Sequence, residues 1–308
     1  MPAYERVMVT GGSGRLGSHV VDELRPDYHV TVLDRVPPSQ DVAFIEADIE
    51  DRDTLAKAFT GMDAVIQLAA LDLGTAAEES RFFQVNVQGL WNVLEFAEAA
   101  EVQRTVVCSS ITALEISRTQ PPQYLPVDSH HPAAPTHAYA ISKRVGEVMA
   151  EAFSRRSAMQ VLCLRPAYIV RDAAVYSLAQ LIATADNTPS PPPMTDPSWE
   201  PQRKERPGSR SFVSPGDAAR CFRAALEAHV PEFDIFNVAA ADTYSALDTL
   251  DVVRREFGSD PEVREPNLYA RDPRASIYDI SHTRDVLGWV PRERWADVMA
   301  RVVSAKKS

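Results

Sequence analysis

The first 34 residues contain the pattern that most restricts the fold of this chain. A short β-branched run, Arg6-Val7-Met8-Val9-Thr10, leads directly into Gly11-Gly12-Ser13-Gly14-Arg15-Leu16-Gly17, which opens a helical pattern, and a second such run ends at Asp34. A dinucleotide's pyrophosphate must lie against bare backbone N–H groups at a helix N-terminus, where a side chain would hold it away. Strand, glycines, helix, second strand and acid in this order predict a dinucleotide-binding site.

The acid at the end of the second strand predicts which dinucleotide binds. A carboxylate at this position accepts hydrogen bonds from both hydroxyls of the adenosine ribose and repels a 2′-phosphate, so Asp34 favours NAD over NADP. The neighbouring Arg35 is the contrary feature, because it could stack on adenine, pair with a 2′-phosphate or lie solvated on the surface. From this segment we expect cofactor contacts at Gly11, Gly14, Arg15, Leu16, Gly17, Asp34 and Arg35.

Strand-like runs alternate with helical patterns through the first half of the chain. The strand-like runs are residues 6–10, 29–33, 64–68, 104–108 and 160–164, and apolar spacing of three to four indicates helices within 14–25, 52–60, 77–100 and 139–156. Such alternation is typical of βαβ units. We therefore predict an α/β fold, a Rossmann-like doubly wound parallel sheet with helices on both faces.

The pattern changes after about residue 170. We expect a nucleotide-binding domain over residues 1–170, carrying the catalytic residues, and a smaller substrate-binding part over 171–308, interleaved with the first. Eight of the 23 prolines fall between residues 189 and 215, a density that excludes helix and central strand and predicts a long loop over 187–215. Such a loop is a substrate-facing lid or a connector. Beyond it we expect helices near 215–229, 245–257 and 293–304 and a strand at 234–238.

Composition narrows the class of partner. The 308 residues carry 32 Lys and Arg against 43 Asp and Glu, a net charge of −11, which disfavours nucleic acid and anionic membranes. No apolar run approaches the roughly 18 residues that span a bilayer, and no secretory pattern opens the chain, so we expect a cytoplasmic protein. The three cysteines are far apart in sequence and suggest neither a disulfide framework nor a metal site.

Tyr139 and Lys143 form the second chemical motif. They lie four residues apart at the start of a predicted helix, so both side chains share one face. The ammonium can then stabilise the phenolate, and a tyrosine in that state can act as general acid-base toward a substrate hydroxyl.

Together with the glycine loop and Asp34, several further motifs resemble the extended short-chain dehydrogenases/reductases, in their NAD-dependent epimerase/dehydratase branch. These motifs are Asp48-Ile49, Leu68-Ala69-Ala70, Asn86, Ser109-Ser110, Tyr139 with Lys143, Leu164-Arg165-Pro166, the segment 211–217, Phe236-Asn237-Val238-Ala239 and the segment 287–291. The resemblance covers almost the whole chain and implies an NAD-binding enzyme.

The resemblance also implies residue roles. Tyr139 would be the catalytic acid-base, Lys143 would support it and bind the nicotinamide ribose, and Ser110 would orient the substrate oxygen, with Ser109 or Thr112 as alternatives. Asn86 would anchor a helix or join a proton relay. Asp48 and Ile49 would border the adenine, Leu68, Ala69 and Ala70 would pass under the cofactor, and Arg165, Pro166 and Ala167 would lie beside the nicotinamide.

Departures from the family pattern bear on the reaction. Dehydratases of the branch resemble one another in a Thr-Asp-Glu run, where this chain has Ser110-Ile111-Thr112, and Ile111 supplies neither acid nor base. The segment 212–217 is similar to the uronate dehydrogenase branch. Asp72 beside the substrate would suit a neutral polyol better than a carboxylate, or it would be a loop carboxylate. Arg210 opens a partly kept Arg-Asp-Phe-Val run and is expected at the substrate, with Ser110 and Thr112.

We therefore expect an NAD-dependent oxidoreductase that takes hydride from a secondary alcohol or lactol of a small carbohydrate-like substrate. The alternatives are a nucleotide-sugar 4-epimerase that reduces NAD transiently and a non-catalytic NAD-binding sensor. Two long predicted helices keep further apolar positions after one face of each is buried on the sheet, for example Phe82, Leu90, Val145 and Met149. These positions predict a homodimer through a four-helix bundle. No metal is expected.

Overall fold

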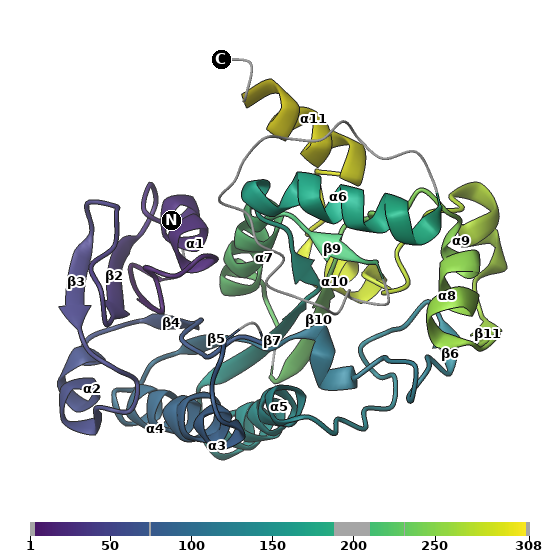
Figure 1. Ribbon diagram of the computed structural model, residues 1–308. Helices are drawn as coiled ribbons and strands as arrows, with labels where there is room; N and C mark the ends of the chain where they lie inside the picture. The colour runs from purple at the N-terminus through teal and green to yellow at the C-terminus, as the bar shows by residue number, and fades with distance from the viewer. Residues whose placement is uncertain (1–3, 74, 188–209, 231, 306–308) are drawn as a thin grey trace.

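The computed structural model describes residues 4–73, 75–187, 210–230 and 232–305, and its centre is a seven-stranded parallel sheet with helices on both faces (Figure 1). The predicted Rossmann-like α/β fold is confirmed. In spatial order the strands are β10 (Asp234–Val238), β7 (Gln160–Pro166), β5 (Arg104–Cys108), β4 (Ala64–Gln67), β1 (Arg6–Thr10), β2 (His29–Asp34) and β3 (Ala43–Glu46).

The strand order reverses direction between β1 and β4. From β1 the chain builds outward through β2 and β3 on one side, and through β4, β5, β7 and β10 on the other. The loops at the carboxyl ends of β1 and β4 therefore lead to opposite sides of the sheet and leave a crevice between them, which is where open α/β sheets bind ligands.

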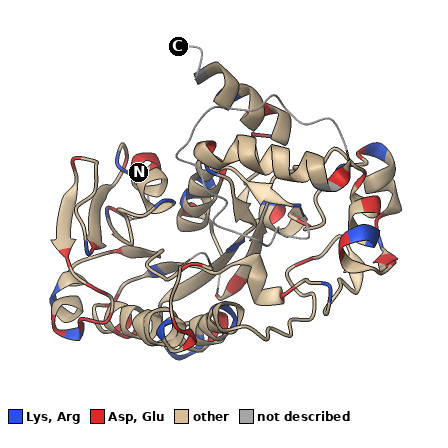
Figure 2. Ribbon diagram, viewed as in Figure 1, with Lys and Arg blue, Asp and Glu red and all other residues tan. Residues whose placement is uncertain are grey.

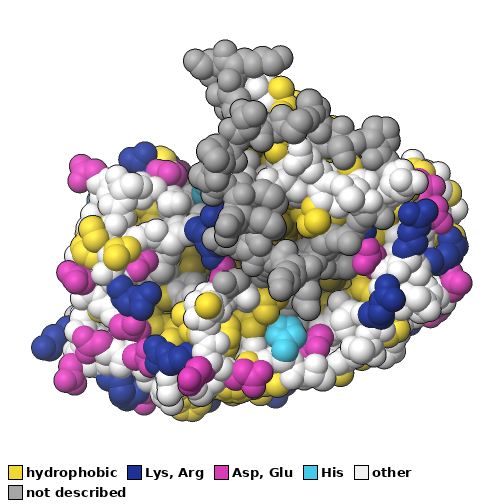
Figure 3. Space-filling model, viewed as in Figure 1, with side chains coloured by type: hydrophobic (Ala, Val, Ile, Leu, Met, Phe, Trp, Pro, Cys, Tyr) yellow, Lys and Arg dark blue, Asp and Glu magenta, His cyan; other side chains and the backbone are white. Residues whose placement is uncertain are grey.

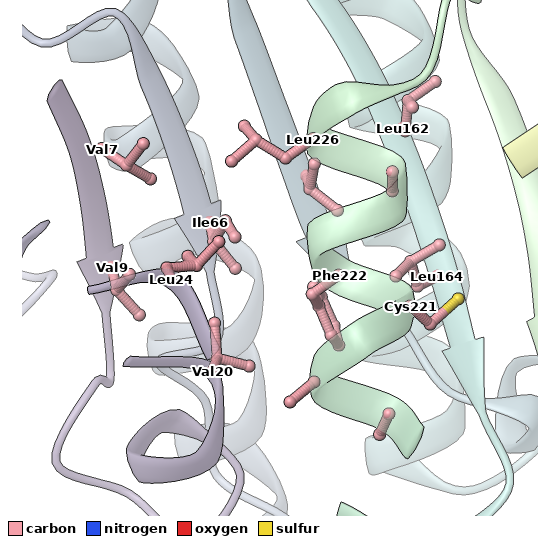
Figure 4. Close-up of a cluster of buried hydrophobic side chains, with 14 of the residues drawn as sticks. Val7, Val9, Val20, Leu24, Ile66, Leu162, Leu164, Cys221, Phe222 and Leu226 are labelled. Atoms are coloured by element: carbon pink, nitrogen blue, oxygen red, sulfur yellow. The ribbon is translucent and has the colours of Figure 1, made fainter. Parts of the chain in front are cut away.

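One face of the sheet is covered by α1 (Gly17–Leu24), α7 (Pro215–Glu227) and α10 (Ser281–Leu287). Figure 4 shows Phe222 and Leu226 of α7 facing β-strand side chains such as Ile66 and Leu164. These side chains are fully or almost fully buried, and each contributes about 1.5–3 kcal/mol relative to exposure. This helical layer holds the sheet in place, including the carboxyl ends of β1 and β4, where the loops of the crevice begin.

The opposite face is covered by α2 (Arg52–Ala58), α3 (Glu79–Phe82), α4 (Leu90–Ala99) and α5 (Ala138–Arg156). The helix expected over 77–100 is not uniform, because a π-helical stretch, η1 (Phe83–Gly89), joins α3 to α4. Gly89 lies in that stretch against Ile49, and a Cβ on Gly89 would stand only 2.5 Å from the Ile49 Cδ1. The glycine therefore lets the helix approach the segment that follows β3.

Elements that follow β5 in the chain pack around two smaller apolar clusters beside the sheet. They are a 3₁₀ turn, η2 (Ile111–Leu114), β6 (Tyr124–Leu125), β8 (Tyr168–Ile169), α6 (Asp172–Asp186), β9 (Phe212–Val213), α8 (Thr249–Phe257), β11 (Glu262–Val263), α9 (Pro266–Arg271) and α11 (Trp295–Ala305).

Three features of this half differ from the sequence prediction or add to it. Helix α6 was not predicted. The strand β9 lies inside the stretch that we predicted as loop 187–215, and it pairs with β8, which precedes that stretch. Residues 188–209 of that loop lie outside the described residues. The strand predicted at 234–238 is present, and as β10 it pairs in parallel with β7 at the edge of the main sheet.

Lys, Arg, Asp and Glu residues occur mainly in the outer helices and loops, with both signs interspersed (Figure 2). Among the described residues, no helix combines the length and apolar character needed to cross a bilayer.

Candidate active site

The glycine loop folds tightly at the crevice between β1 and β4. Gly11 has φ +70°, and a Cβ there would stand 2.6 Å from the Ala69 backbone nitrogen, so only glycine lets the loop approach the end of β4. Gly14 N donates to Gly11 O at 3.0 Å, and Gly17, at the start of α1, packs directly on the backbone of Gly11 and Gly12. A glycine-rich turn that opens a helix in this way has the backbone geometry that binds a pyrophosphate.

Asp34 lies at the end of β2 beside this loop. Its two carboxylate oxygens accept backbone N–H bonds, one from Ser13 at 3.0 Å and one from Arg35 at 2.7 Å. Two ionised oxygens offer about four acceptor sites, so the carboxylate keeps the capacity to hold ribose hydroxyls. The Arg35 side chain is exposed, and its guanidinium lies 3.9 Å from the Asp48 carboxylate.

The segments expected around the rest of the cofactor lie at the same sheet edge. Asp48 and Ile49 follow β3, where Ala47 N donates to Asp34 O at 3.0 Å, and Ile49 is buried. Leu68, Ala69 and Ala70 follow β4 and pass the glycine loop. Pro166 ends β7. The structure thus brings the predicted cofactor residues together along one crevice.

Tyr139 and Lys143 share one face of the first turns of α5. The Lys143 Nζ donates a hydrogen bond to the carbonyl oxygen of Cys108 at 2.8 Å and lies 5.7 Å from the centre of the Tyr139 ring. Cys108 is the last residue of β5, so this bond places the ammonium at the carboxyl end of the central strand. The Lys143 ammonium is thus held beside the Tyr139 ring.

The three candidate hydroxyls after β5 have different surroundings. Ser109 is buried, and its hydroxyl donates to the Glu147 carboxylate at 2.7 Å. Ser110 caps η2 by accepting the Thr112 N–H at 3.2 Å, and it also accepts the Thr112 hydroxyl at 2.8 Å. The turn η2 packs against α5, the helix that carries Tyr139, and the Ser109 hydroxyl is already engaged with Glu147 of that helix.

The Asn86 side chain binds the loop after β4. It accepts from Leu71 N at 2.8 Å and donates to Leu71 O at 3.0 Å, and its amide nitrogen also lies 3.1 Å from the Ser142 hydroxyl. The residue therefore ties the loop after β4 to η1 and α5. Asn86, Ser142 and Lys143 also border a small cavity of about 10 Å³, room for about one water molecule.

Two residues that we expected at the substrate are paired with opposite charges. The Asp72 carboxylate contacts the Arg15 guanidinium and accepts the Thr75 hydroxyl at 2.8 Å. Arg210 is 2% exposed, and its guanidinium pairs with Asp186 at 3.1 Å and with Glu256. Neither side chain stands at the site as an unpaired charge.

Two residues at this site were not found from the sequence. Glu147, one turn beyond Lys143 on α5, is fully buried and binds Arg165 of β7 at 2.6 Å. His137 caps α5 by accepting the Ala140 N–H at 3.3 Å, and its ring stacks on Tyr139 with centroids 6.4 Å apart. The only available signal for Glu147 was its spacing of four from Lys143.

In Figure 3, hydrophobic side chains show mainly below the centre of the view, and charged side chains lie mostly toward its left and right sides. Within the described part of the chain, His, Cys, Asp and Glu side chains form no group of three that could hold a metal ion.

A parallel sheet that is doubly wound, with a glycine loop at the switch point and an acid on the neighbouring strand, defines a dinucleotide-binding α/β protein. Residues 7–239 match the NAD dependent epimerase/dehydratase family. The chain belongs to this family and is an NAD-dependent enzyme.

Relatives in the family include both epimerases and dehydrogenases. A putative UDP-glucose 4-epimerase of Methanocaldococcus jannaschii is 28% identical over 98% of this chain and 98% of its own length. An L-arabinose 1-dehydrogenase (NAD(P)(+)) of Haloferax volcanii is 29% identical over 81% of this chain and 93% of its own. Among solved structures, a short-chain dehydrogenase/reductase superfamily protein of Agrobacterium tumefaciens with bound NAD superposes with a TM-score of 0.73 at 21% identity, covering 98% and 97% of the two chains.

Proposed function

We propose that this enzyme is a dehydrogenase that oxidises a secondary alcohol or lactol of a small sugar-like substrate. The observation that carries the proposal is the placement of Lys143, whose Nζ reaches Cys108 O at 2.8 Å and so stands between Tyr139 and the end of β5. This arrangement supplies a general base and its cation beside the Ser110 and Thr112 hydroxyls. NAD bound in the crevice would accept the hydride.

The residues have distinct parts in this reaction. Ser110, oriented by its bonds from Thr112, holds the substrate hydroxyl. Tyr139, as phenolate, takes the hydroxyl proton while the carbon loses its hydride. Lys143 stabilises the phenolate and also holds the nicotinamide ribose. Ala70, after β4, and Pro166, at the end of β7, would border the cofactor.

Among the described residues, the charge pattern favours a free sugar over a nucleotide sugar. A nucleotide diphosphate needs cations that are available to it, and Arg210, the described cation that we expected at the substrate, is already neutralised by Asp186 and Glu256. Arg15 is similarly paired with Asp72. The L-arabinose dehydrogenase relative agrees with this preference, whereas the putative UDP-glucose epimerase relative supports the alternative, a nucleotide-sugar 4-epimerase.

The test is a screen of NAD reduction with free sugars, polyols, sugar acids and nucleotide sugars. Net NADH formation with a free sugar supports the dehydrogenase. Interconversion of a nucleotide sugar without net NADH, by protein that is purified with NAD bound, supports the epimerase and rejects our proposal. Absence of both activities, with NAD binding retained, would favour the sensor.

A homodimer is proposed for the same enzyme. Phe82 and Leu90, which we expected on the outer face of the helices, are buried instead, at 7% and 5% exposure. The exposed apolar side chains on η1, α4 and α5 are Phe83, Trp91 and Val148. These three residues supply the apolar surface for association through the α4 and α5 face.

A further inference from the structure

We propose that Glu147 is a positioning residue that, through Ser109, fixes α5 against the end of β5 and thereby sets the distance between Tyr139, Lys143 and Ser110. This inference rests on the proposed function, because it assigns those three residues to the reaction. Glu147 itself touches neither the substrate nor the cofactor crevice.

The Glu147 carboxylate is fully engaged inside the protein. Its Oε1 accepts from the Ser109 hydroxyl at 2.7 Å and from Arg165 Nε at 2.6 Å. Its Oε2 accepts from Arg165 Nη2 at 2.8 Å and from Arg144 Nη1 at 3.0 Å. The Glu147 side chain is 0% exposed and that of Arg165 is 2% exposed, so solvent screens this network little.

Glu147 adds a second attachment between α5 and the end of β5, beside the one that Lys143 makes. Lys143 and Glu147 are four residues apart on one face of α5, about 6 Å along the helix axis. Lys143 binds the carbonyl of Cys108, and Glu147 binds the side chain of the next residue, Ser109. The apolar face of α5 already packs on the sheet, and two bonds to consecutive residues restrain both the height and the rotation of the helix at the end of β5. Ser110 follows immediately.

We call the network of Glu147, Ser109, Arg165 and Arg144 the clamp. Arg165 extends the clamp to two further segments. It lies in β7 directly before Pro166, and its Nη1 donates to Ser129 O at 2.8 Å in the segment that leads to α5. The clamp therefore joins the ends of β5 and β7. These strand ends carry Ser110, which we expect at the substrate, and Pro166, which we expect at the nicotinamide.

The energetics support a positional role over a purely stabilising one. Burial by itself raises the pKa of the Glu147 carboxyl, but the hydrogen bonds and the charge of Arg165, together with Ser109 and Arg144, hold that pKa below its usual range. A buried ion pair typically gains little over apolar residues of the same volume. What the pair does supply is a fixed geometry, and catalysis is sensitive to displacements of about 1 Å.

The test compares Ser109→Ala and Glu147→Gln with a matched control. Glu151 lies one turn further along α5, is 38% exposed and pairs with Arg155 at 2.6 Å, so Glu151→Gln makes the same chemical change outside the clamp. We expect kcat to fall on the order of tenfold in Ser109→Ala and on the order of a hundredfold in Glu147→Gln, with little change in Glu151→Gln. KM for the sugar should change less than kcat, because the substrate contacts remain.

The pH dependence separates positioning from stability. If Lys143 moves away from Tyr139, the phenolate forms only at higher pH, so the loss of rate should be larger at neutral than at alkaline pH. Ser109→Ala changes no formal charge, so a shift in its profile does not come from a lost or gained charge. Glu147→Gln removes a negative charge and by that effect alone would shift the profile to lower pH, opposite to our expectation. The other charged or titratable groups around Tyr139, Lys143 and Glu147 include Arg144, Arg165, Cys108, Cys163 and His137.

Two outcomes would overturn the inference. One is a lowered melting temperature with a pH–rate profile parallel to that of the wild type and an unchanged kcat per folded molecule, which would make the clamp structural only. The other is unchanged activity in both variants. If the wild type turns over no substrate, the proposed function fails on its own. Tyrosinate absorbance of the NAD-bound protein, corrected with Tyr139→Phe, then tests whether Ser109→Ala raises the pH at which Tyr139 ionises; an unchanged pH would reject the clamp.

Discussion

Lys143 of α5 and Cys108 of β5 are joined by one hydrogen bond of 2.8 Å between the Nζ and the carbonyl oxygen. Because Cys108 is the last residue of its strand, the bond brings a cation to the sheet edge where the strand ends converge. Tyr139 stands one turn earlier on the same helix, so the predicted acid-base and its cation are positioned by the fold itself.

Replacing Tyr139 by phenylalanine should abolish turnover while leaving the affinity for NAD nearly unchanged, because the proposed mechanism places the phenol at the substrate. General acid-base groups contribute about 10²–10⁴-fold to rate, and kcat should fall by at least that range. Lys143→Met should lower both kcat and the affinity for NAD, since we propose that the ammonium also holds the ribose. Steady-state kinetics and NAD titration check this. Wild-type activity in Tyr139→Phe would reject the assigned mechanism.

Asp34→Ala should weaken NAD binding and reduce the preference for NAD over NADP. The carboxylate would no longer accept the ribose hydroxyls or repel a 2′-phosphate, and the Ser13 N–H would lose its acceptor. Dissociation constants for both cofactors, in the wild type and the variant, measure the effect. Wild-type protein that prefers NADP would show that Asp34 does not have this role.

His131 should make the fold less stable in mild acid. It is 5% exposed, and its Nε2 accepts the Gln123 N–H at 3.0 Å. Burial lowers the pKa of the imidazole, and Arg264 adds to this effect against the opposing influence of Pro132 and Asp128. The folded state therefore favours the neutral ring, and its contribution is fully present above about pH 6.5 and is lost as the pH falls from there toward the lowered folded-state value.

Urea unfolding at about pH 7.5 and 5.5 measures this contribution, because a tenfold difference in proton affinity between the folded and unfolded states corresponds to about 1.4 kcal/mol. In His131→Gln the loss of unfolding free energy between the two pH values should be smaller than in the wild type. Equal losses in the two proteins would show that other groups cause the acid sensitivity.

Val148→Glu should dissociate the proposed homodimer. Val148 is 53% exposed on α5, and a buried carboxylate at an interface without a partner is strongly unfavourable. Val290→Glu is the matched control, because Val290 is 49% exposed outside α5 and η1. Light scattering should give twice the 34.0 kDa chain mass for the wild type and the control, and the chain mass for Val148→Glu. A monomeric wild type would contradict the proposal.

The sheet was largely predictable because its buried strands are short β-branched runs between helical patterns. The strand β3, Ala43–Glu46, was missed because it lies at the edge and two of its four residues are exposed. Helix α6 was missed although Val175, Leu178 and Ile182 have helical spacing and are buried, because the prolines that follow dominated the interpretation of this region.

The site was predictable where local sequence determines it and not where distant segments meet. The glycine loop and the Tyr139–Lys143 spacing are local patterns, and the structure brings them to one crevice. Whether Arg210 or Asp72 is an unpaired charge depends on Asp186, Glu256 and Arg15, whose positions only the folded chain defines. The same holds for the contact of Ser109 with Glu147.

The place of β10 at the sheet edge also has a consequence for synthesis on the ribosome. β7 is complete when residue 166 has emerged, but its outer edge is paired only by residues 234–238. Until those residues leave the exit tunnel, the nascent chain has an uncovered strand beside its cofactor crevice, and such edges promote association between chains. The pace of translation between these two strands therefore bears on how much of the enzyme reaches its native state.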